Sequence, residues 1–375
     1  MDTVVYNINA ERRIKVGQIG CGWHPYMNLL PSFRYAPIDL VATCDVDLHR
    51  AEETARLFGG QRAYTDYREL LASERELDAV VVVTNYLPDG RPRYPEIATA
   101  ALEAGLHVWM EKPPGSSLAD VIALEAASER AGKFVQVGVK KGFYPTIERM
   151  REISRREEFG GLVSLYATYP LRIPPADQCR DLRAMRSLLD VLWHPAGAIH
   201  YIGGDAEYLT FRSAPNGGGV ALFVFKSGAV GVLHMTGGEP HGIPAITLEW
   251  MEVVGANQSL LLDNNVRLTW YRKPTPPPGG YQRATTFIGD DEGAARYWEP
   301  EMSRGTVYNS NHMLSGYALE LNHFAQAVLT NRPPSKGNLE QCEEIMAWFE
   351  AFQSGPEGER ISIPALRRRA AAAVR

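Results

Sequence analysis

The sequence is poor in cysteine, carries little excess charge and has no long apolar run. Only four cysteines occur among 375 residues, and no two of them form a Cys-x-x-Cys pair. This usage argues against a disulfide framework and a structural zinc site, and it is typical of proteins kept in a reducing compartment. We therefore predict a cytoplasmic protein with reduced thiols and no metal ion.

The charge balance and hydropathy exclude further classes. The formal net charge is −5, and the one strongly basic run, residues 367–369, lies near the end of the chain. A nucleic-acid or anionic-membrane partner is therefore not expected. No apolar run approaches the ~18 residues of a membrane span, and the polar residues 1–13 do not resemble a signal peptide. We expect a small-molecule partner.

What the sequence does contain is a regular alternation of strand and helix patterns over its first third. Expected strands cover residues 15–19, 39–44, 78–83, 106–110 and 134–137, and expected helices cover 50–58, 67–72, 94–104 and 117–131. This order predicts an α/β fold with a doubly wound parallel sheet. The length favours two domains.

Glycines and an acid at the ends of the first two strands form a candidate dinucleotide site. Gly20-Cys21-Gly22 lets the backbone turn sharply and approach a pyrophosphate at the start of the next helix. Asp45 follows at roughly the 20-residue spacing of a ribose-binding acid. Because a carboxylate repels a 2′-phosphate, Asp45 predicts NAD rather than NADP. The alternatives are a plain tight turn and a helix cap at Asp45.

Two further candidate residues directly follow Gly20-Cys21-Gly22, which we call the glycine turn. Trp23 and His24 precede Pro25, which occupies the place where the dinucleotide fingerprint usually has glycine or alanine. Proline is tolerated in the first turn of a helix, so a helix is still expected to follow.

The third and fourth strands also end in polar residues. Thr84-Asn85 follows the third strand, where small polar groups can meet a nicotinamide ribose, and Glu111-Lys112-Pro113 follows the fourth. An ammonium at the carboxyl edge of such a sheet can bind a substrate hydroxyl or exchange a proton. The Lys112–Pro113 bond is a candidate cis peptide. The alternative is a surface turn with a solvated Glu–Lys pair.

The second half of the sequence has a different pattern. Expected strands at residues 162–169, 220–225, 230–235, 246–254, 259–262 and 266–271 are separated by turns, which predicts a large, mostly antiparallel sheet. Expected helices cover 147–153, 317–329 and 339–352. We predict an N-terminal arm over residues 1–13, a Rossmann domain over 14–138, an α+β substrate-binding and oligomerisation domain over 139–364, and a tail over 365–375.

Asp190 and His194 are the candidate proton-transfer pair. Four positions apart on one helix, they would share a face. An aspartate beside a histidine fixes its tautomer and raises its basicity, as a general base requires. The alternative is a buried histidine that is satisfied by its neighbour.

Four segments together resemble the Rossmann half of the glucose–fructose oxidoreductase/inositol dehydrogenase/MocA family. They are residues 16–22, Cys44-Asp45-Val46-Asp47, residues 101–108 and Glu111-Lys112-Pro113. The resemblance implies that Lys112 contacts the nicotinamide ribose and the substrate hydroxyl, and that His194, next to Asp190, takes the hydroxyl proton. It also implies a homodimer or homotetramer formed through the open face of the second sheet.

This chain departs from the family at three positions near the expected substrate pocket. Gly142 stands where the family often has arginine, Gly197 replaces an acid, and Trp193 replaces a glycine. Lys140 and Lys141 are candidates for an anion contact that Gly142 cannot make; the alternative is a solvated basic turn. The pocket is therefore expected to differ from those of the family.

These observations predict an NAD-dependent oxidoreductase that takes hydride from a secondary alcohol of a sugar, inositol or related polyol. The residues predicted to bind the cofactor are Gly20, Cys21, Gly22, Trp23, His24, Asp45, Thr84, Asn85, Glu111 and Lys112. Those predicted to meet the substrate are Lys112, Lys140, Tyr144, Arg172, Asp190, His194 and His312. Two alternatives remain: an enzyme with tightly bound NAD that transiently oxidises a glycoside for elimination or hydrolysis, and an NAD-binding sensor without turnover.

Overall fold

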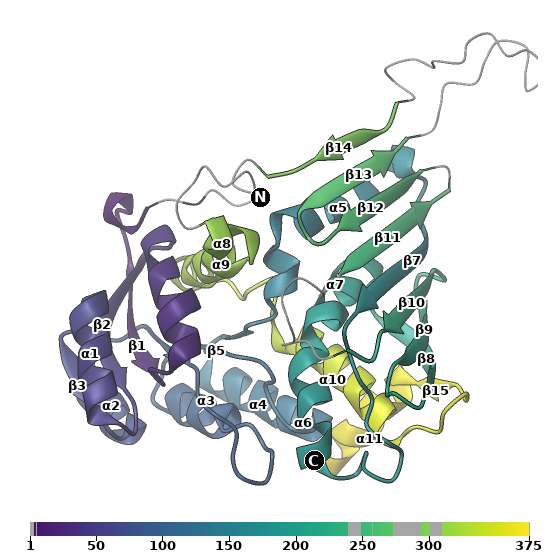
Figure 1. Ribbon diagram of the computed structural model, residues 1–375. Helices are drawn as coiled ribbons and strands as arrows, with labels where there is room; N and C mark the ends of the chain where they lie inside the picture. The colour runs from purple at the N-terminus through teal and green to yellow at the C-terminus, as the bar shows by residue number, and fades with distance from the viewer. Residues whose placement is uncertain are drawn as a thin grey trace, which may run out of the picture.

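The first of two β-sheets is parallel throughout. The computed structural model describes residue 4 and residues 6–238, 249–256, 258–272, 294–300 and 310–374 (Figure 1). Six strands stand in the order β3-β2-β1-β4-β5-β6. They are β1 (Ile14–Ile19), β2 (Ile38–Cys44), β3 (Arg62–Tyr64), β4 (Ala79–Val82), β5 (His107–Met110) and β6 (Val135–Val137). The doubly wound sheet is confirmed, and only the short β3 was not predicted. Strand order reverses between β1 and β4, where such folds open a ligand crevice.

Helices cover both faces of this sheet. On one face, α3 (Tyr94–Glu103) and α4 (Leu118–Ala131) pack against Val80, Val82 and Val108. On the other face lies α9 (Tyr317–Thr330), whose Phe324 belongs to the same buried cluster as Trp109 of β5. Two further helices, α1 (Leu48–Phe58) and α2 (Tyr67–Ser73), lie beside β2 and β3. Because α9 comes from late in the chain, the first sheet depends on the second half of the sequence.

The helix expected after the glycine turn is irregular. A π-helix, η2 (Pro25–Leu29), is followed by a 3₁₀ helix, η3 (Leu30–Tyr35). Pro31 falls in the first turn of η3 and has no N–H to donate to an α-helical ladder. By contrast, α4 begins with a complete capping box, Ser117 with Asp120, and ends at Gly132 in the left-handed conformation.

The second sheet has nine strands in the order β14-β13-β12-β11-β7-β10-β9-β8-β15. The β7–β10 pairing is parallel and the other pairings are antiparallel, as the sequence predicted. Asn264 and Asn265 take positive φ angles between β12 and β13, the conformation of a tight hairpin turn. The strands are β7 (Leu162–Tyr169), β8 (Ala206–Ser213), β9 (Gly219–Phe225), β10 (Val230–Met235), β11 (Trp250–Gly255), β12 (Ser259–Asp263), β13 (Arg267–Tyr271), β14 (Arg296–Trp298) and β15 (Ile361–Ser362).

The remaining helices lie between the two sheets or on the second one. Of these, α7 contacts β7 and β10, while α10 contacts both α4 and β8 (Figure 1). Helix α6 runs directly into α7. Their bounds are α5 (Pro145–Ser154), α6 (Leu182–Val191), α7 (Trp193–Gly203), α8 (Ser310–Leu314), α10 (Leu339–Ser354) and α11 (Ile363–Val374). Three short 3₁₀ segments are η1 (Asn7–Asn9), η4 (Lys140–Phe143) and η5 (Glu157–Phe159).

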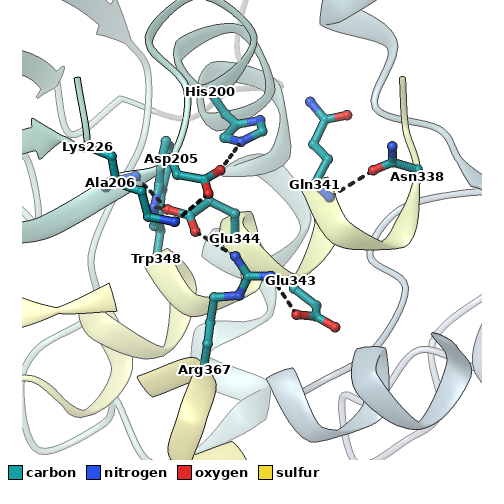
Figure 2. Close-up of polar contacts among 10 residues, drawn as sticks. All are labelled: His200, Asp205, Ala206, Lys226, Asn338, Gln341, Glu343, Glu344, Trp348 and Arg367. Carbon is teal, nitrogen blue, oxygen red and sulfur yellow. Dashed lines mark hydrogen bonds and ion pairs between the residues drawn. The ribbon is translucent and has the colours of Figure 1, made fainter. Parts of the chain in front are cut away.

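The predicted tail over residues 365–375 is wrong, because residues 363–374 form helix α11. Figure 2 shows the Arg367 guanidinium between Glu343 and Glu344 of α10, at 2.8 and 3.3 Å. Glu344 also accepts hydrogen bonds from the Ala206 N–H and the Trp348 indole. Arg367 of the basic run therefore has carboxylate partners in the fold, whereas Arg368 and Arg369 are exposed.

The same cluster fixes the carboxyl end of α7. His200, in the last turn of α7, contacts Asp205 at 3.0 Å, and Lys226 contacts the other oxygen of Asp205 at 2.8 Å (Figure 2). The hydrogen bond from His200, followed by that from the Lys226 ammonium, holds the pKa of Asp205 below its usual value. This anchoring matters because α7 begins beside His194.

All four cysteines are free thiols and are buried. Within the described residues, no helix combines the length and apolar character that a membrane crossing requires. The same part of the chain holds no group of three or more His, Cys, Asp or Glu side chains placed to bind a metal ion.

Candidate functional site

A cavity of about 850 Å³ lies at the carboxyl ends of β1, β2, β4 and β5 and is closed on its far side by residues of α6, α7 and α9. It occupies the crevice expected where the strand order reverses. Both halves of the chain line it. The predicted residues that it gathers are Gly20, Gly22, Trp23, His24, Asp45, Thr84, Asn85, Glu111, Lys112, Lys140, Asp190 and His194.

The glycine turn forms one wall of the cavity. Gly20 has φ +90°, and a Cβ there would lie 1.7 Å from the Val83 carbonyl oxygen, so no side chain fits. A Cβ at Gly22 would meet no atom within 4 Å, because this residue faces open space. The turn therefore leaves room for a ligand beside exposed backbone, which a pyrophosphate requires.

Asp45 is held in place by backbone donors. Its Oδ2 accepts the Cys21 N–H at 2.8 Å, and its Oδ1 accepts the Asp47 N–H at 3.0 Å. The cap of α1 is Asp47 rather than Asp45, so the helix-cap alternative for Asp45 is wrong. Cys21 itself turns its thiol toward the Cys44 carbonyl and contributes only its backbone to this arrangement.

Arg50, Tyr67 and Arg68 were not predicted to line the cavity, whereas Thr84 was predicted as a cofactor-binding residue. Arg50 places a guanidinium nitrogen 3.9 Å from Asp45 Oδ1 and lines the same end of the cavity, as do Tyr67 and Arg68. Thr84 Oγ1 is buried and has no hydrogen-bond partner among the described residues, although it borders the cavity. An unsatisfied hydroxyl at such a position fits a ligand with polar groups.

Glu111 is buried beneath the cavity and contacts a residue of the glycine-turn segment. His24 Nε2 lies 2.9 Å from Glu111 Oε1, and the Lys112 N–H donates to Oε2 at 3.1 Å. Burial would raise the pKa of Glu111, but His24, Lys112 and Lys140 outweigh it and hold this pKa below its usual value. Only 7% of Glu111 is exposed, so the alternative of a solvated surface turn is wrong. The Lys112–Pro113 bond is cis, as predicted.

Lys112 reaches across the cavity to α6. Its Nζ donates to Asp190 Oδ1 at 2.8 Å and to the Asp190 carbonyl at 3.1 Å. The ammonium therefore meets the side-chain carboxylate and the backbone carbonyl of one residue of α6 at the same point.

The prediction that Asp190 and His194 lie on one helix needs correction. Asp190 is the penultimate residue of α6, whereas His194 is the second residue of α7, and Leu192 separates the two helices. Both residues still line the cavity. The His194 ring lies 6.2 Å from the Tyr169 ring at an interplanar angle of 31°. A direct role for Asp190 in orienting His194 remains a prediction.

Lys140 and Lys141 each have a partner inside the fold, so the alternative of a solvated basic turn is wrong. Lys140 lines the cavity, donates to the Tyr317 hydroxyl at 2.8 Å and lies 4.5 Å from that ring. Burial disfavours its ammonium, but Tyr144, Tyr317 and Glu111 together raise the pKa of Lys140 above its usual value. Lys141 is buried, is paired with Glu249, and lies outside this cavity lining.

Three predicted substrate residues lie elsewhere. Tyr144 is buried under the Lys141 ammonium, 4.6 Å from it. His312 is buried, and its Nε2 contacts the Met27 carbonyl at 3.0 Å. Arg172 is exposed on the segment after β7. None of the three is among the described residues that line the cavity, so we leave them out of the candidate site.

Tyr86 and Tyr317 line the cavity and were missed. Tyr86 directly follows Thr84-Asn85, so its position at the end of β4 was a usable signal. Its hydroxyl donates to Asp190 Oδ1 at 2.9 Å. Tyr317 begins α9, more than half the chain away from the glycine turn, and nothing in the local sequence connects it with the site.

Comparisons with known proteins agree with this geometry. Residues 14–139 match a family model described as an oxidoreductase family with an NAD-binding Rossmann fold. D-apiose dehydrogenase of Paraburkholderia graminis is 26% identical over 71% of this chain and 74% of its own length. Myo-inositol 2-dehydrogenase of Thermotoga maritima is 25% identical over 86% of this chain and 91% of its own length.

The fold is shared with solved structures over nearly the whole chain. A dehydrogenase from Chromobacterium violaceum superposes with a TM-score of 0.75 and 23% identity, covering 97% of this chain and all of that one. Residues 14–139 therefore correspond to the NAD-binding Rossmann fold of an oxidoreductase family. This match and the two named relatives agree with the resemblance of the sequence to the glucose–fructose oxidoreductase/inositol dehydrogenase/MocA family.

Proposed function

We propose that this protein is an NAD-dependent oxidoreductase that takes hydride from a secondary alcohol of a sugar, inositol or related polyol. The observation that carries the proposal is that Lys112, paired with Asp190 across the two halves of the chain, and His194 line the same cavity as the glycine turn and Asp45. The names of the two sequence relatives, an apiose and an inositol dehydrogenase, support this substrate class.

The residues present fit a nicotinamide dinucleotide. Gly22 leaves open space for a pyrophosphate, and Asp45 offers carboxylate oxygens to a ribose. The Thr84 hydroxyl has no hydrogen-bond partner among the described residues and is available to the ligand. When bound, the nicotinamide supplies the hydride acceptor. Asp45 favours NAD because its charge repels a 2′-phosphate, although Arg50 at 3.9 Å offsets part of that repulsion. A test with NADP is therefore part of the proposal.

The chain's own groups would handle the substrate hydroxyl. His194 accepts the hydroxyl proton, since a neutral imidazole is a suitable base near neutral pH. Lys112 donates a hydrogen bond to the same oxygen and stabilises the negative charge that develops on it. Asp190 holds the Lys112 ammonium at the cavity wall, 2.8 Å away, before the substrate arrives.

The sheet face away from the helices supports the proposed homodimer or homotetramer. Val220 and Leu222 of β9 and Val230 of β10 are exposed on neighbouring strands, and Tyr166 stacks on Trp250 at 5.0 Å. Apolar side chains gathered on one sheet face are typical of an interface. Light scattering coupled to gel filtration would show a multiple of the 41.6-kDa chain mass if this face associates, and a monomer if it does not.

The central experiment is a screen for NADH formation over sugars, inositols and related polyols, with NADP in parallel. Turnover with NAD on at least one member supports the proposal. Release of a free sugar without net NADH would favour the transient-oxidation alternative instead. Binding of NAD with no turnover across the whole panel would favour the sensor and contradict the proposed reaction.

A further inference from the structure

A tight turn after β4 links the two halves of the molecule. The Leu87 N–H donates to the Arg91 carbonyl at 2.8 Å, the Gly90 N–H donates to the Leu87 carbonyl at 2.9 Å, and Tyr86 pairs with Pro92 in an isolated bridge. We call residues 86–92 the Tyr86 turn. Because its ends are hydrogen-bonded to each other, the turn is a defined element rather than an extended loop.

The tip of the Tyr86 turn rests on the start of α6. Gly90 has φ +89°, and a Cβ built there would lie 3.2 Å from Leu182 and Arg183 backbone atoms. Such a close approach favours glycine both for its backbone angle and for its lack of a side chain. The turn, which follows a strand of the first sheet, is therefore seated on the helix that carries Asp190.

The Tyr86 side chain completes this link. Its ring lies between Tyr94, at 6.4 Å in an edge-on arrangement, and the Arg186 guanidinium, at 5.3 Å. Its hydroxyl donates to Asp190 Oδ1 at 2.9 Å. Burial, reinforced by Asp190, raises the pKa of Tyr86 far above its usual value, so the hydroxyl stays protonated and acts as a donor.

Tyr86 and Lys112 use the same oxygen of Asp190. Lys112 Nζ donates to Oδ1 at 2.8 Å, next to the bond from Tyr86. A carboxylate oxygen accepts about two hydrogen bonds in its plane, so these two donors occupy Oδ1 and set the rotation of the whole group.

We propose that Tyr86 is a positioning residue for the reactive groups: its hydroxyl fixes the Asp190 carboxylate, which in turn holds the Lys112 ammonium at the cavity wall. The inference rests on the proposed function for the reaction that it serves. What the inference adds is the contact among Tyr86, Asp190 and Lys112. These residues come from both halves of the chain, and no sequence motif contains all three.

The kinetic test is the substitution Tyr86→Phe, which removes one hydroxyl and keeps the ring. We expect kcat to fall about tenfold or more, since a hydrogen bond to a charged group is lost. KM for NAD should be unchanged, because the glycine turn and Asp45 are untouched. Tyr201→Phe is the matched control: it removes a hydroxyl that donates to Glu148 at 3.3 Å, outside the cavity lining. A wild-type kcat in Tyr86→Phe would overturn the proposal.

A second measurement does not need turnover. Reductive ¹³C-methylation of the lysines keeps their charge, and the NMR signal missing in Lys112→Arg identifies Lys112. We expect that signal to shift in Tyr86→Phe and to stay in place in Tyr201→Phe. An unmoved signal in Tyr86→Phe would refute the positioning role whatever the activity. A moved signal in a protein with no turnover on the polyol panel would support the Tyr86 contact and contradict the proposed function.

Discussion

The two sides of the cavity are built in different ways. On the side of the first sheet, the contacts join residues of the same sheet: the Cys21 N–H binds Asp45, and His24 contacts Glu111. On the side of α6 and α7, Asp190 takes its partners, Lys112 and Tyr86, from the first half of the chain. The proposed cofactor side, with the glycine turn and Asp45, therefore takes these contacts from the strand ends of one sheet, whereas the proposed reactive side, with Lys112 and Asp190, forms only where the two halves meet.

The largest effect should come from breaking the reactive side at Lys112. We expect Lys112→Met to lower kcat by roughly 10²- to 10⁴-fold, because the substrate oxygen loses its cationic donor. NADH affinity, measured by fluorescence titration, should change little, since the proposed contacts at the glycine turn and Asp45 are kept. Lys15→Met is the control: it breaks an exposed pair between Lys15 and Glu76 at 2.5 Å, at the amino end of β1 and outside the cavity lining. Equal losses in both variants would mean that the Lys112 effect is only structural.

Asp45 tests the cofactor side in the same way. Asp45→Ala should raise KM for NAD by about tenfold or more, the usual worth of hydrogen bonds to a charged group, and should improve the use of NADP. At saturating NAD, kcat should change far less than in Lys112→Met. Steady-state kinetics with both cofactors measure this, and Asp263→Ala, an exposed residue of β12 outside the cavity lining, is the control. An unchanged ratio of NAD to NADP use would contradict the role of Asp45.

The contrast between the two sides also explains what the sequence could predict. The first sheet and the residues at its strand ends follow from local patterns: a buried β-branched run, a glycine turn, an acid at a set spacing and a cis-proline candidate. The capping box at Ser117 was likewise visible as a short motif. Each of these features depends on residues that are neighbours in the chain.

The errors concern contacts between distant segments. Tyr317 reaches Lys140 only because α9 packs on the first sheet, and His312, a lone histidine in the sequence, contacts Met27 instead of the cavity. Arg367 looked like part of a charged tail because its partners, Glu343 and Glu344, lie on another helix. Long-range packing decides such positions, and periodicity does not encode it.

The buried carboxyl group of Glu320 allows a test of how protein stability depends on pH. It lies on α9, fully buried, and neither carboxyl oxygen has a partner among the described residues. Burial, with Glu111 nearby, raises the pKa of Glu320 well above its usual value. The folded state therefore binds a proton that the unfolded state has lost, so stability should fall as pH rises from the unfolded to the folded pKa.

The expected slope in that range is at most about 1.4 kcal/mol per pH unit. Glu320→Gln should remove this component, so its melting temperature should gain on the wild type as pH rises from about 5 to 8. Melting curves across pH measure the difference, with the exposed Glu103→Gln as control. A gap between Glu320→Gln and wild type that does not depend on pH would show that Glu320 is ionised in the folded protein.

The smallest effect is expected at Tyr317, which connects the two sides through Lys140. Tyr317→Phe keeps the ring beneath the Lys140 ammonium and removes the hydroxyl at 2.8 Å. The Lys140 ammonium loses one hydrogen bond but keeps the aromatic ring as its partner. We therefore expect the KM for substrate to rise only a few-fold, which corresponds to about 1 kcal/mol. Initial rates measured against substrate concentration test this, and a larger change in KM for NAD than for substrate would assign Tyr317 to the cofactor side.

The most direct measurement of the central claim is a double-mutant cycle between Lys112 and His194, read as kcat for NADH formation on a substrate found in the polyol screen. If both groups act on one hydroxyl, the two losses should be strongly non-additive, and Lys112→Met/His194→Ala should be little slower than the worse single variant. Losses that simply multiply would mean that the two residues act independently, and they would contradict a shared reaction centre between the two halves of the chain.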